Sequence, residues 1–488
     1  GSMGMIALDG SATTDGFLSR AQRSLGAGRV TDLGALAALL LAGLTLAIGV
    51  PLPVALLAIA CAGVAAVIAP AAATAAALAS VPLVLQPVSV GESRFSLLEL
   101  AIVLGTIGLA AQVALEVVRS RSLTVVSRLL RPLPTLALPI VLIAAATLSL
   151  FTVADPRHIG ESLREYRLVI LEPVAIIALA RWTLRRGGER LLITAFVAAA
   201  VVAALVGAVQ VLTGYGTIEA DAARRATGPY SHPNHLALYL ERVGLLLGGM
   251  ALVEAEKRRR LAPVLIAIGA GLASTVSRGG FLAAVAGGAT IIWLARSKGA
   301  WRWLMVSTVV AVAAFGMLAE QRLLATGSDG SASTRELLWS ASIRMIRDHP
   351  IFGVGLDQFL YQYRPRYVDP AGWAERYTSH PHNLVLDFWL RLGLAGLVVL
   401  AAMIGALGWA LARIRRQAVA AGGVAVGAAA ALVGGVVHGL VDNSFFLPDL
   451  AVMTWFFVAL LEFHLSRQGQ DAAGDRVAQP VPERTGAA

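Results

Sequence analysis

Long apolar runs alternate with short polar connectors along most of the chain, and this pattern predicts helices that span a membrane. A spanning helix needs about 20 mostly apolar residues, and by this test the chain has about 12–14 transmembrane helices. The segments that meet it lie at 33–50, 52–69, 72–90, 97–118, 134–153, 166–181, 191–212, 234–253, 261–277, 279–296, 302–319, 383–411, 418–440 and 447–465. We therefore predict an all-α polytopic membrane protein.

Composition supports the same class. The 488 residues are 57% hydrophobic and 14% charged, whereas a soluble globular chain has about 25% charged and 45–50% apolar residues. The excess apolar surface requires lipid. The net charge of +10 is spread between the apolar segments and forms no single patch, which argues against a nucleic-acid partner. The single cysteine, Cys61, rules out an internal disulfide.

The basic residues between the apolar segments predict the orientation, because cytoplasmic loops are enriched in Lys and Arg. With the N-terminus inside, every short basic connector falls on the cytoplasmic side. These connectors hold Arg119, Arg121, Arg128 and Arg131, then Arg181, Arg185, Arg186 and Arg190, then 257–260, then Arg296, Lys298 and Arg302, and finally Arg413, Arg415 and Arg416. The external side then carries 154–167, 213–233, the turn around Arg278, and 320–382.

The spans divide the chain into five predicted parts. They are a cytoplasmic tail at 1–32, transmembrane helices over 33–319, a long periplasmic loop with short helices at 320–382, further transmembrane helices over 383–465, and a disordered cytoplasmic tail at 466–488. Within the long loop, Thr334 is expected to cap a helix that runs from Arg335 to about Asp348. Pro350 should end that helix.

An arginine pair, Arg224 and Arg225, precedes the turn Gly228-Pro229 on the external side. Asn234 follows as the expected cap of the next helix. Arginines held by a turn near a helix N-terminus form an anion site, because guanidinium groups and backbone N–H groups converge there. The alternative is a basic loop that touches lipid headgroups.

Arg278 lies between two apolar segments with almost no loop, and glycines follow it. An ionisable residue at the membrane surface is costly unless paired, so it is a functional candidate. Snorkelling to the headgroups is the alternative.

Two histidines, His380 and His382, stand where the long loop enters a spanning helix. The positive end of a helix dipole favours the neutral imidazole, which is the form a general base needs. A zinc site built from these two with His232 and His235 is the rival reading. The sequence shows no carboxylate or thiol partner among these histidines and no Asp-x-Asp in the external loops, so we predict no metal and no cofactor.

These features fit the attack of an acceptor hydroxyl on a sugar linked to a lipid diphosphate. The chain also resembles the O-antigen ligase and O-antigen polymerase superfamily over roughly residues 190–465. The resemblance is carried by 225–230 with Pro233-Asn234, by 277–279, by 335–339, by 348–355, and by His382-Asn383 followed by 392–396.

The resemblance implies a periplasm-facing glycosyltransferase of the bacterial inner membrane that uses undecaprenyl diphosphate donors and inverts the anomeric centre. It maps function onto Arg225, Arg278 and His382. We also expect Arg224 to bind the donor diphosphate together with Arg225 and Arg278, and we expect supporting roles for His380, Asn383, Asn234 and Tyr230. The acceptor expected first is the lipid A-core oligosaccharide, as in O-antigen ligases. O-antigen polymerases and enzymes that glycosylate protein are the alternatives within the family.

A membrane transporter is the alternative from another class. Glu241, Arg242 and Arg391 fall inside predicted spans, as charged residues on a transport path would. A transporter would also show internal repeats, and the sequence contains no convincing one.

Overall fold

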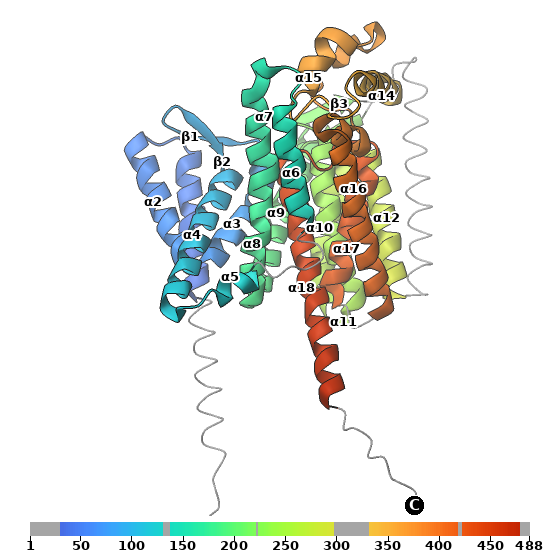
Figure 1. Cartoon of the computed structure of the whole chain (residues 1–488). Coiled ribbons are helices and arrows are strands. Elements are labelled where there is room, and N and C mark those ends of the chain that lie inside the picture. The colour runs from blue at the N-terminus through green and yellow to red at the C-terminus, as the bar shows by residue number, and fades with distance from the viewer. Residues whose placement is uncertain (1–29, 130–136, 221–222, 297–330, 418–421, 479–488) are drawn as a thin grey trace, which may run out of the picture.

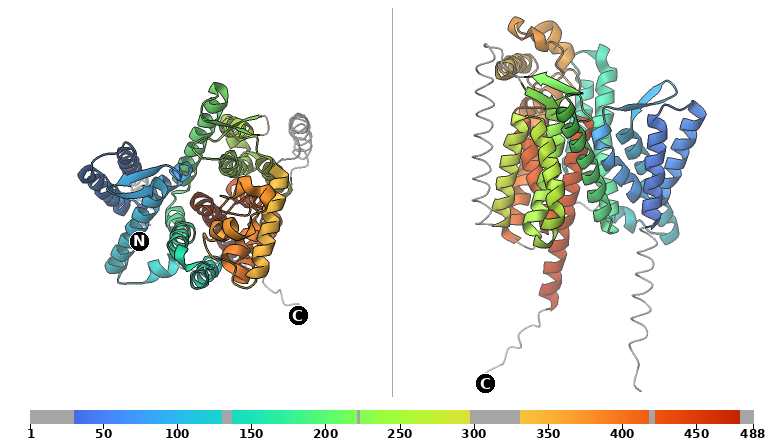
Figure 2. Two further views of the ribbon diagram at one scale, coloured as in Figure 1. Left: turned by 90° about the horizontal axis from the view of Figure 1, so that it is seen from above. Right: turned by 180° about the vertical axis from the view of Figure 1, so that it is seen from behind.

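The computed structural model describes residues 30–129, 137–220, 223–296, 331–417 and 422–478. Its long helices run side by side, and the N-terminal helices form a lobe to one side of the main bundle (Figures 1 and 2). Two β-hairpins and the helices α14 (Ser331–Asp348) and α15 (Phe359–Gln362) lie at one end of the bundle, called the hairpin end below (Figure 1). The predicted all-α polytopic fold is confirmed.

Among the described residues, eight helices are long and apolar enough to cross a membrane. They are Val30–Ala47, α4 (Leu97–Ser120), α9 (Glu189–Thr213), α10 (Pro233–Val253), α12 (Arg278–Ala295), α16 (Leu384–Gln417), α17 (Gly422–Gly439) and the part Pro448–Arg467 of α18 (Pro448–Ala478). Shorter apolar helices are α2 (Leu52–Ile68), α3 (Pro70–Ala79) and α6 (Ala137–Phe151). The remaining helices between these are α5 (Thr124–Leu129), α7 (Ile159–Glu165), η4 (Tyr166–Leu171), α8 (Glu172–Arg185) and α11 (Ala255–Ser274). The predicted span 302–319 lies outside the described residues, so the total of 12–14 stays a prediction.

The segment 72–90, predicted as one span, is divided. Helix α3 ends at Ala79, a short 3₁₀ turn (Val81–Leu83) follows, and β1 (Pro87–Val90) pairs antiparallel with β2 (Ser93–Ser96). Pro82 and Pro87 lack the backbone N–H that a continuing helix would need. A second hairpin, β3 (Thr217–Ala220) with β4 (Ala223–Ala226), precedes α10.

The long loop carries helices, as predicted. They are α14 (Ser331–Asp348), α15 (Phe359–Gln362), η5 (Tyr363–Tyr367) and the 3₁₀ helix η6 (Pro370–Glu375). Helix α14 ends where expected but begins at Ser331, so Thr334 lies inside it and is not the cap. The residues between Ser331 and Thr334 include neither Gly nor Pro, and nothing there stops a helix.

The tail predicted to be disordered from 466 is helical up to Ala478, as the last part of α18. Adding residues to an existing helix is far easier than nucleating a new one. The Gln, Ala, Asp and Arg residues after the span therefore continue it.

Helices α10 and α17 form the centre of the main bundle and approach through glycines. A Cβ added to Gly249 of α10 would lie 2.4 Å from the Cα of Gly427 in α17. Small residues allow this close approach between membrane helices. The contact places the start of α10 beside the connector 440–447, which follows α17.

Charged residues inside the bundle are paired, as their burial requires. His438 Nδ1 lies 2.8 Å from Glu241 Oε2, and both side chains are fully buried. Arg242 donates to the carbonyl oxygens of Ser444, at 2.6 Å, and Leu450, at 3.3 Å. Of the three residues that prompted the transporter alternative, Arg242 therefore anchors the connector 440–447, and Glu241 is paired with the end of α17.

The third such residue, Arg391 of α16, also has partners. Its Nε donates to Asp387 at 2.7 Å, and its guanidinium pairs with Glu165. A further, longer bond of 3.4 Å reaches the carbonyl of Ser379. Arg391 thus ties α16 to α7 and to the segment that leads into the histidines.

Helix α16 bends at Gly393, whose φ of 66° and ψ of −152° are not helical. At the bend, Leu394 donates its N–H to the carbonyl of Ile351 at 2.8 Å. A Cβ at position 393 would lie 2.1 Å from the same oxygen. The bend therefore fixes the hairpin end of α16 against the turn after α14.

We expect Gly393→Ala to destabilise the protein by at least about 1–3 kcal/mol, because only glycine adopts this backbone conformation without strain. Thermal unfolding of the purified protein in detergent measures the effect. Gly405→Ala, in the same helix and with nothing within 4 Å of its Cβ position, is the matched control. Equal unfolding temperatures for the two variants would contradict the strain.

Candidate functional site

A cavity of about 460 Å³ opens at the hairpin end, between the starts of α10, α12 and α14 and the connector before α16. Several residues predicted for the site line this one cavity. They are Arg225, Arg278, Asn234, His380 and His382, together with His232 and His235.

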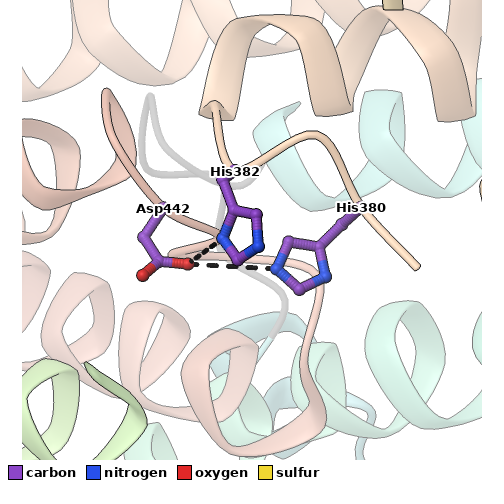
Figure 3. Close-up of side chains that lie close together, drawn as sticks. All are labelled: His380, His382 and Asp442. Atoms are coloured by element: carbon purple, nitrogen blue, oxygen red, sulfur yellow. Dashed lines mark hydrogen bonds and ion pairs between the residues drawn. The ribbon is translucent and has the colours of Figure 1, made fainter. Parts of the chain in front are cut away.

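The centre of the cavity wall is a contact between His382 and Asp442. Figure 3 shows the imidazole Nδ1 directed at the carboxylate, 2.7 Å from Oδ1. His380 lies beside it, with Nε2 at 3.9 Å from the same oxygen and the two imidazole ring centroids 4.2 Å apart. The backbone N–H of Asn443 also donates to Oδ1, at 2.8 Å.

The electrostatics of this group fix which imidazole nitrogen carries a proton. Burial alone would raise the pKa of Asp442, but the charge of His382 and the close approach of both imidazoles outweigh it and hold that pKa well below its usual range. An ionised carboxylate only accepts hydrogen bonds. Nδ1 of His382 therefore donates in the shared bond, and in the neutral form of this imidazole Nε2 is the nitrogen that can accept a proton. Burial, followed by the neighbouring His382, lowers the pKa of His380.

Asn234 joins this pair to Arg225. Its amide nitrogen donates to Asp442 Oδ2 at 2.6 Å, and its amide oxygen accepts from Arg225 at 2.8 Å. Arg225 Nε donates in addition to the carbonyl of Thr275, at 2.9 Å. A continuous hydrogen-bonded chain thus runs from Arg225 through Asn234 and Asp442 to His382.

The prediction that Asn234 caps α10 is wrong. His232 is the N-cap, and its Nδ1 accepts from the backbone N–H of Asn234 at 3.2 Å. Because a histidine makes this cap, the amide side chain of Asn234 can bridge to Asp442.

Arg278 is the first residue of α12. Ser277 caps that helix by accepting from the N–H of Gly280 at 3.2 Å. Gly279 lies against the buried His438, and a Cβ there would be 2.4 Å from the imidazole ring. The absence of a side chain at position 279 thus lets α17 hold the start of α12, and Arg278 with it, at the cavity.

Three predicted residues lie outside the cavity lining. Arg224 alternates with Arg225 on strand β4, so it faces the other way; it is exposed and pairs with Glu219 at 3.6 Å. Tyr230 is buried and stacks on His235, with ring centroids 4.2 Å apart. Asn383 directly precedes α16 (Leu384–Gln417).

Asn383 caps α16 by accepting from the N–H groups of Val385, at 3.0 Å, and Leu386, at 3.1 Å. Its amide nitrogen donates to the carbonyl of Leu440 at 3.0 Å. The cap therefore joins the segment of His380 and His382 to the end of α17, next to Asp442.

Two residues of the cavity, Asp442 and Arg335, were not predicted as site residues. Nη2 of Arg335 lies 4.0 Å from Oδ2 of Asp442. The sequence did contain one feature that could have indicated Asp442. Asp442, Asn443 and Ser444 form a polar group between the apolar segments 418–440 and 447–465. Counting spans puts this group on the same side of the membrane as His382.

His380, His382 and Asp442 could hold a metal ion, since their ligand atoms lie within 4.8 Å of one another. The prediction that these histidines have no carboxylate partner is wrong. Both oxygens of Asp442 are already engaged, Oδ1 by His382 and Asn443 and Oδ2 by Asn234. This arrangement suits a carboxylate that orients an imidazole.

The fold and the cavity define a multi-pass helical membrane protein with an arginine–histidine site at one end of its bundle. Residues 263–401 match the family model described as O-Antigen ligase. Over these residues the match confirms the predicted resemblance to the O-antigen ligase superfamily, and it supports glycan transfer of the ligase or polymerase type. Arg278, His380 and His382 lie within the match. No curated protein matches the chain.

We expect Asp442→Asn to lower the free energy of unfolding by on the order of 2 kcal/mol, because charge-assisted hydrogen bonds are lost. A carboxylate with a depressed pKa stabilises the fold above its unfolded-state pKa, about 3.9, and loses this contribution only as pH falls through the folded value. The stability gap to wild type should therefore not narrow between pH 7 and pH 5. Protonation of a neighbouring imidazole would widen it. Thermal unfolding at several pH values measures the gap, and a gap that closes by pH 5 would contradict the low pKa.

Proposed function

We propose that this protein transfers a glycan from undecaprenyl diphosphate to the lipid A-core oligosaccharide, at the periplasmic face of a bacterial inner membrane. The observation that carries the proposal is the hydrogen-bonded chain from Arg225 to His382 in a cavity that Arg278 also lines. A cation for a leaving diphosphate and a base for an attacking hydroxyl are thereby coupled in one site.

The donor diphosphate is assigned to Arg225 and Arg278. The contacts of Arg225 with Thr275 and Asn234 fix the plane of its guanidinium, and a fixed fork suits phosphate oxygens. Arg278 adds a second guanidinium at the N-terminus of α12, where the positive end of the helix dipole also favours an anion. The lipid tail would run into the surrounding bilayer.

The reaction is a single displacement. The acceptor oxygen attacks the anomeric carbon as the bond from that carbon to the diphosphate oxygen breaks, so the configuration inverts. The hydroxyl proton passes to Nε2 of His382, and the diphosphate leaves with the bonding electron pair. Arginines aimed at the leaving oxygens lower the barrier, because they stabilise charge that develops in the transition state.

Asp442 completes the base. By accepting from Nδ1 it keeps Nε2 directed at the cavity, and its charge stabilises the imidazolium that forms after proton transfer. No step requires a metal ion, so we propose a metal-independent mechanism.

The acceptor is tested by reconstitution of the purified protein with lipid-linked glycan and lipid A-core. Glycan attached to lipid A-core supports the ligase. Glycan that lengthens on its carrier instead would show a polymerase, and glycan on an added protein acceptor would show a protein glycosyltransferase.

His382→Ala and Arg278→Ala should each lower the rate of transfer by at least about 100-fold, the usual contribution of a general base or of a transition-state cation. The assay measures labelled glycan on lipid A-core in a buffer that contains EDTA, in which wild type should remain active. His158→Ala is the control, because His158 stacks on Tyr361 and does not line the cavity. Near-normal rates in either variant, or loss of wild-type activity in EDTA, would overturn the corresponding role.

Arg225→Lys should lower the rate about tenfold or more, because a lysine cannot donate to Thr275 and Asn234 while also presenting a fork to phosphate. Arg224→Lys, one residue away on the opposite face of β4, should keep the wild-type rate. Equal rates for Arg225→Lys and wild type would show that charge alone suffices.

A further inference from the structure

A second group of arginines and aromatic side chains lies outside the cavity, on η5, η6 and the residues after them. We call it the arginine–aromatic face; its members are Arg364, Arg366, Trp373, Arg376 and Tyr377. Trp373 is 54% exposed and Tyr377 56% exposed, and Arg364 and Arg366 are exposed as well. Large aromatic side chains left in solvent beside charges indicate an interaction surface.

Cation–π contacts hold the guanidinium groups in place. The Cζ of Arg364 lies 4.6 Å from the ring centroid of Tyr377. That of Arg376 lies 4.6 Å from Tyr377 and 5.1 Å from Trp373. Arginines fixed over rings are partly ordered before any ligand arrives, which reduces the entropy cost of binding.

A small apolar core lies beneath the arginine–aromatic face. Phe359 and Tyr363 stack at 5.3 Å and are buried against the apolar side of α14. The hydroxyl of Tyr367 donates to Asp348 at 2.6 Å, and Arg344 donates to the carbonyl of Tyr367 at 2.8 Å. The face is therefore attached to α14 through a small core of its own.

The face leads directly into the cavity. Glu375 of η6 lines the cavity, and its carboxylate accepts from the hydroxyl of Thr378 at 2.9 Å. The next residues along the chain are Ser379 and His380. In Figure 1 the orange part of the chain that contains α15 forms the outermost part of the hairpin end.

We propose that the arginine–aromatic face binds the phosphorylated part of the acceptor oligosaccharide and directs its reactive sugar toward His382. The inference rests on the proposed function, to which it adds the chemical class of the acceptor. Guanidinium forks match phosphate oxygens, and the apolar C–H faces of sugars pack against exposed aromatic rings. Two arginines held against the same ring, Arg364 and Arg376 on Tyr377, suit a phosphate, which carries up to two charges, better than a single carboxylate.

The position of the face favours the acceptor over the donor. The acceptor must meet His382, and the face belongs to the same stretch of chain as the histidines. The donor diphosphate is assigned to Arg225 and Arg278, which come from β4 and α12. The outermost position also favours a soluble oligosaccharide over lipid headgroups, which would contact side chains nearer the helix ends.

The test compares wild type with the full-length double variant Arg364→Gln/Arg376→Gln, both in nanodiscs of neutral lipid. Binding of lipid A-core, intact or chemically dephosphorylated, is measured without donor, and transfer is then measured with varied acceptor. Arg157→Gln is the matched control, since its side chain is 84% exposed and pairs only locally with Asp155. Trp373→Ala/Tyr377→Ala removes the rings and keeps the charges.

We expect the arginine variant to bind intact lipid A-core about tenfold more weakly, as when charge-assisted hydrogen bonds are removed. It should raise the acceptor KM by a similar factor while kcat and the donor KM stay within about twofold of wild type. Dephosphorylated lipid A-core should bind both proteins equally, and the ring variant should weaken both forms.

Three results would overturn the inference. They are unchanged binding of the intact acceptor, a loss confined to kcat, and an equal loss of binding to glycan-free vesicles of anionic phospholipid, which would identify a membrane contact. Failure of the proposed function looks different, because wild type would then transfer no glycan to lipid A-core in either form. The measurement of lipid A-core binding without donor still tests the arginine–aromatic face in that case.

Discussion

The site depends on one buried carboxylate, Asp442, because residues from separate parts of the bundle converge on it. Asn234 comes from α10, His382 precedes α16, and Arg335 approaches from α14. A buried charge is stable only when hydrogen bonds and opposite charges compensate its lost hydration. The requirement to satisfy this carboxylate therefore fixes the relative positions of three chain segments that are distant in sequence.

The membrane-embedded part of the bundle makes this convergence possible. Close glycine contacts between α10 and α17 bring the start of one helix beside the end of the other. Below the cavity, Arg242 holds the carbonyl of Ser444, and Glu241 pairs with His438. Unpaired charge at this depth would be costly, so these pairs hold the connector of Asp442 in one conformation. The polar residues inside the spans are thus the support of the site.

The sequence predicted the features that depend on local pattern, and it did not predict contacts between residues that are distant along the chain. Apolar runs of spanning length identified the helices, and the positions of Arg278 and His382 at helix starts marked one end of the bundle. The partner of His382 could not be identified, because residues 60 positions apart meet only through the packing of α16 on α17. Arg224 and Arg225 were not separated either, because the hairpin that turns them to opposite faces has strands of four residues. Such strands give too short a pattern to recognise.

The family match from 263 to 401 contains Arg278 and His382 but neither Arg225 nor Asp442. The matched segment thus holds the proposed base and one proposed cation, while Asp442 and Arg225, to which we assign the orienting and second cationic roles, come from its two flanks. Even the N-terminal lobe takes part, since Gln86 donates to the carbonyl of Pro229 at 2.6 Å, in the turn after Arg225, and Leu85 lines the cavity. A site assembled in this way requires the whole bundle, because each flank supplies a polar group whose partner lies in another segment. The physical unit of function is therefore the membrane domain as a whole, although the recognisable pattern covers a smaller part of it.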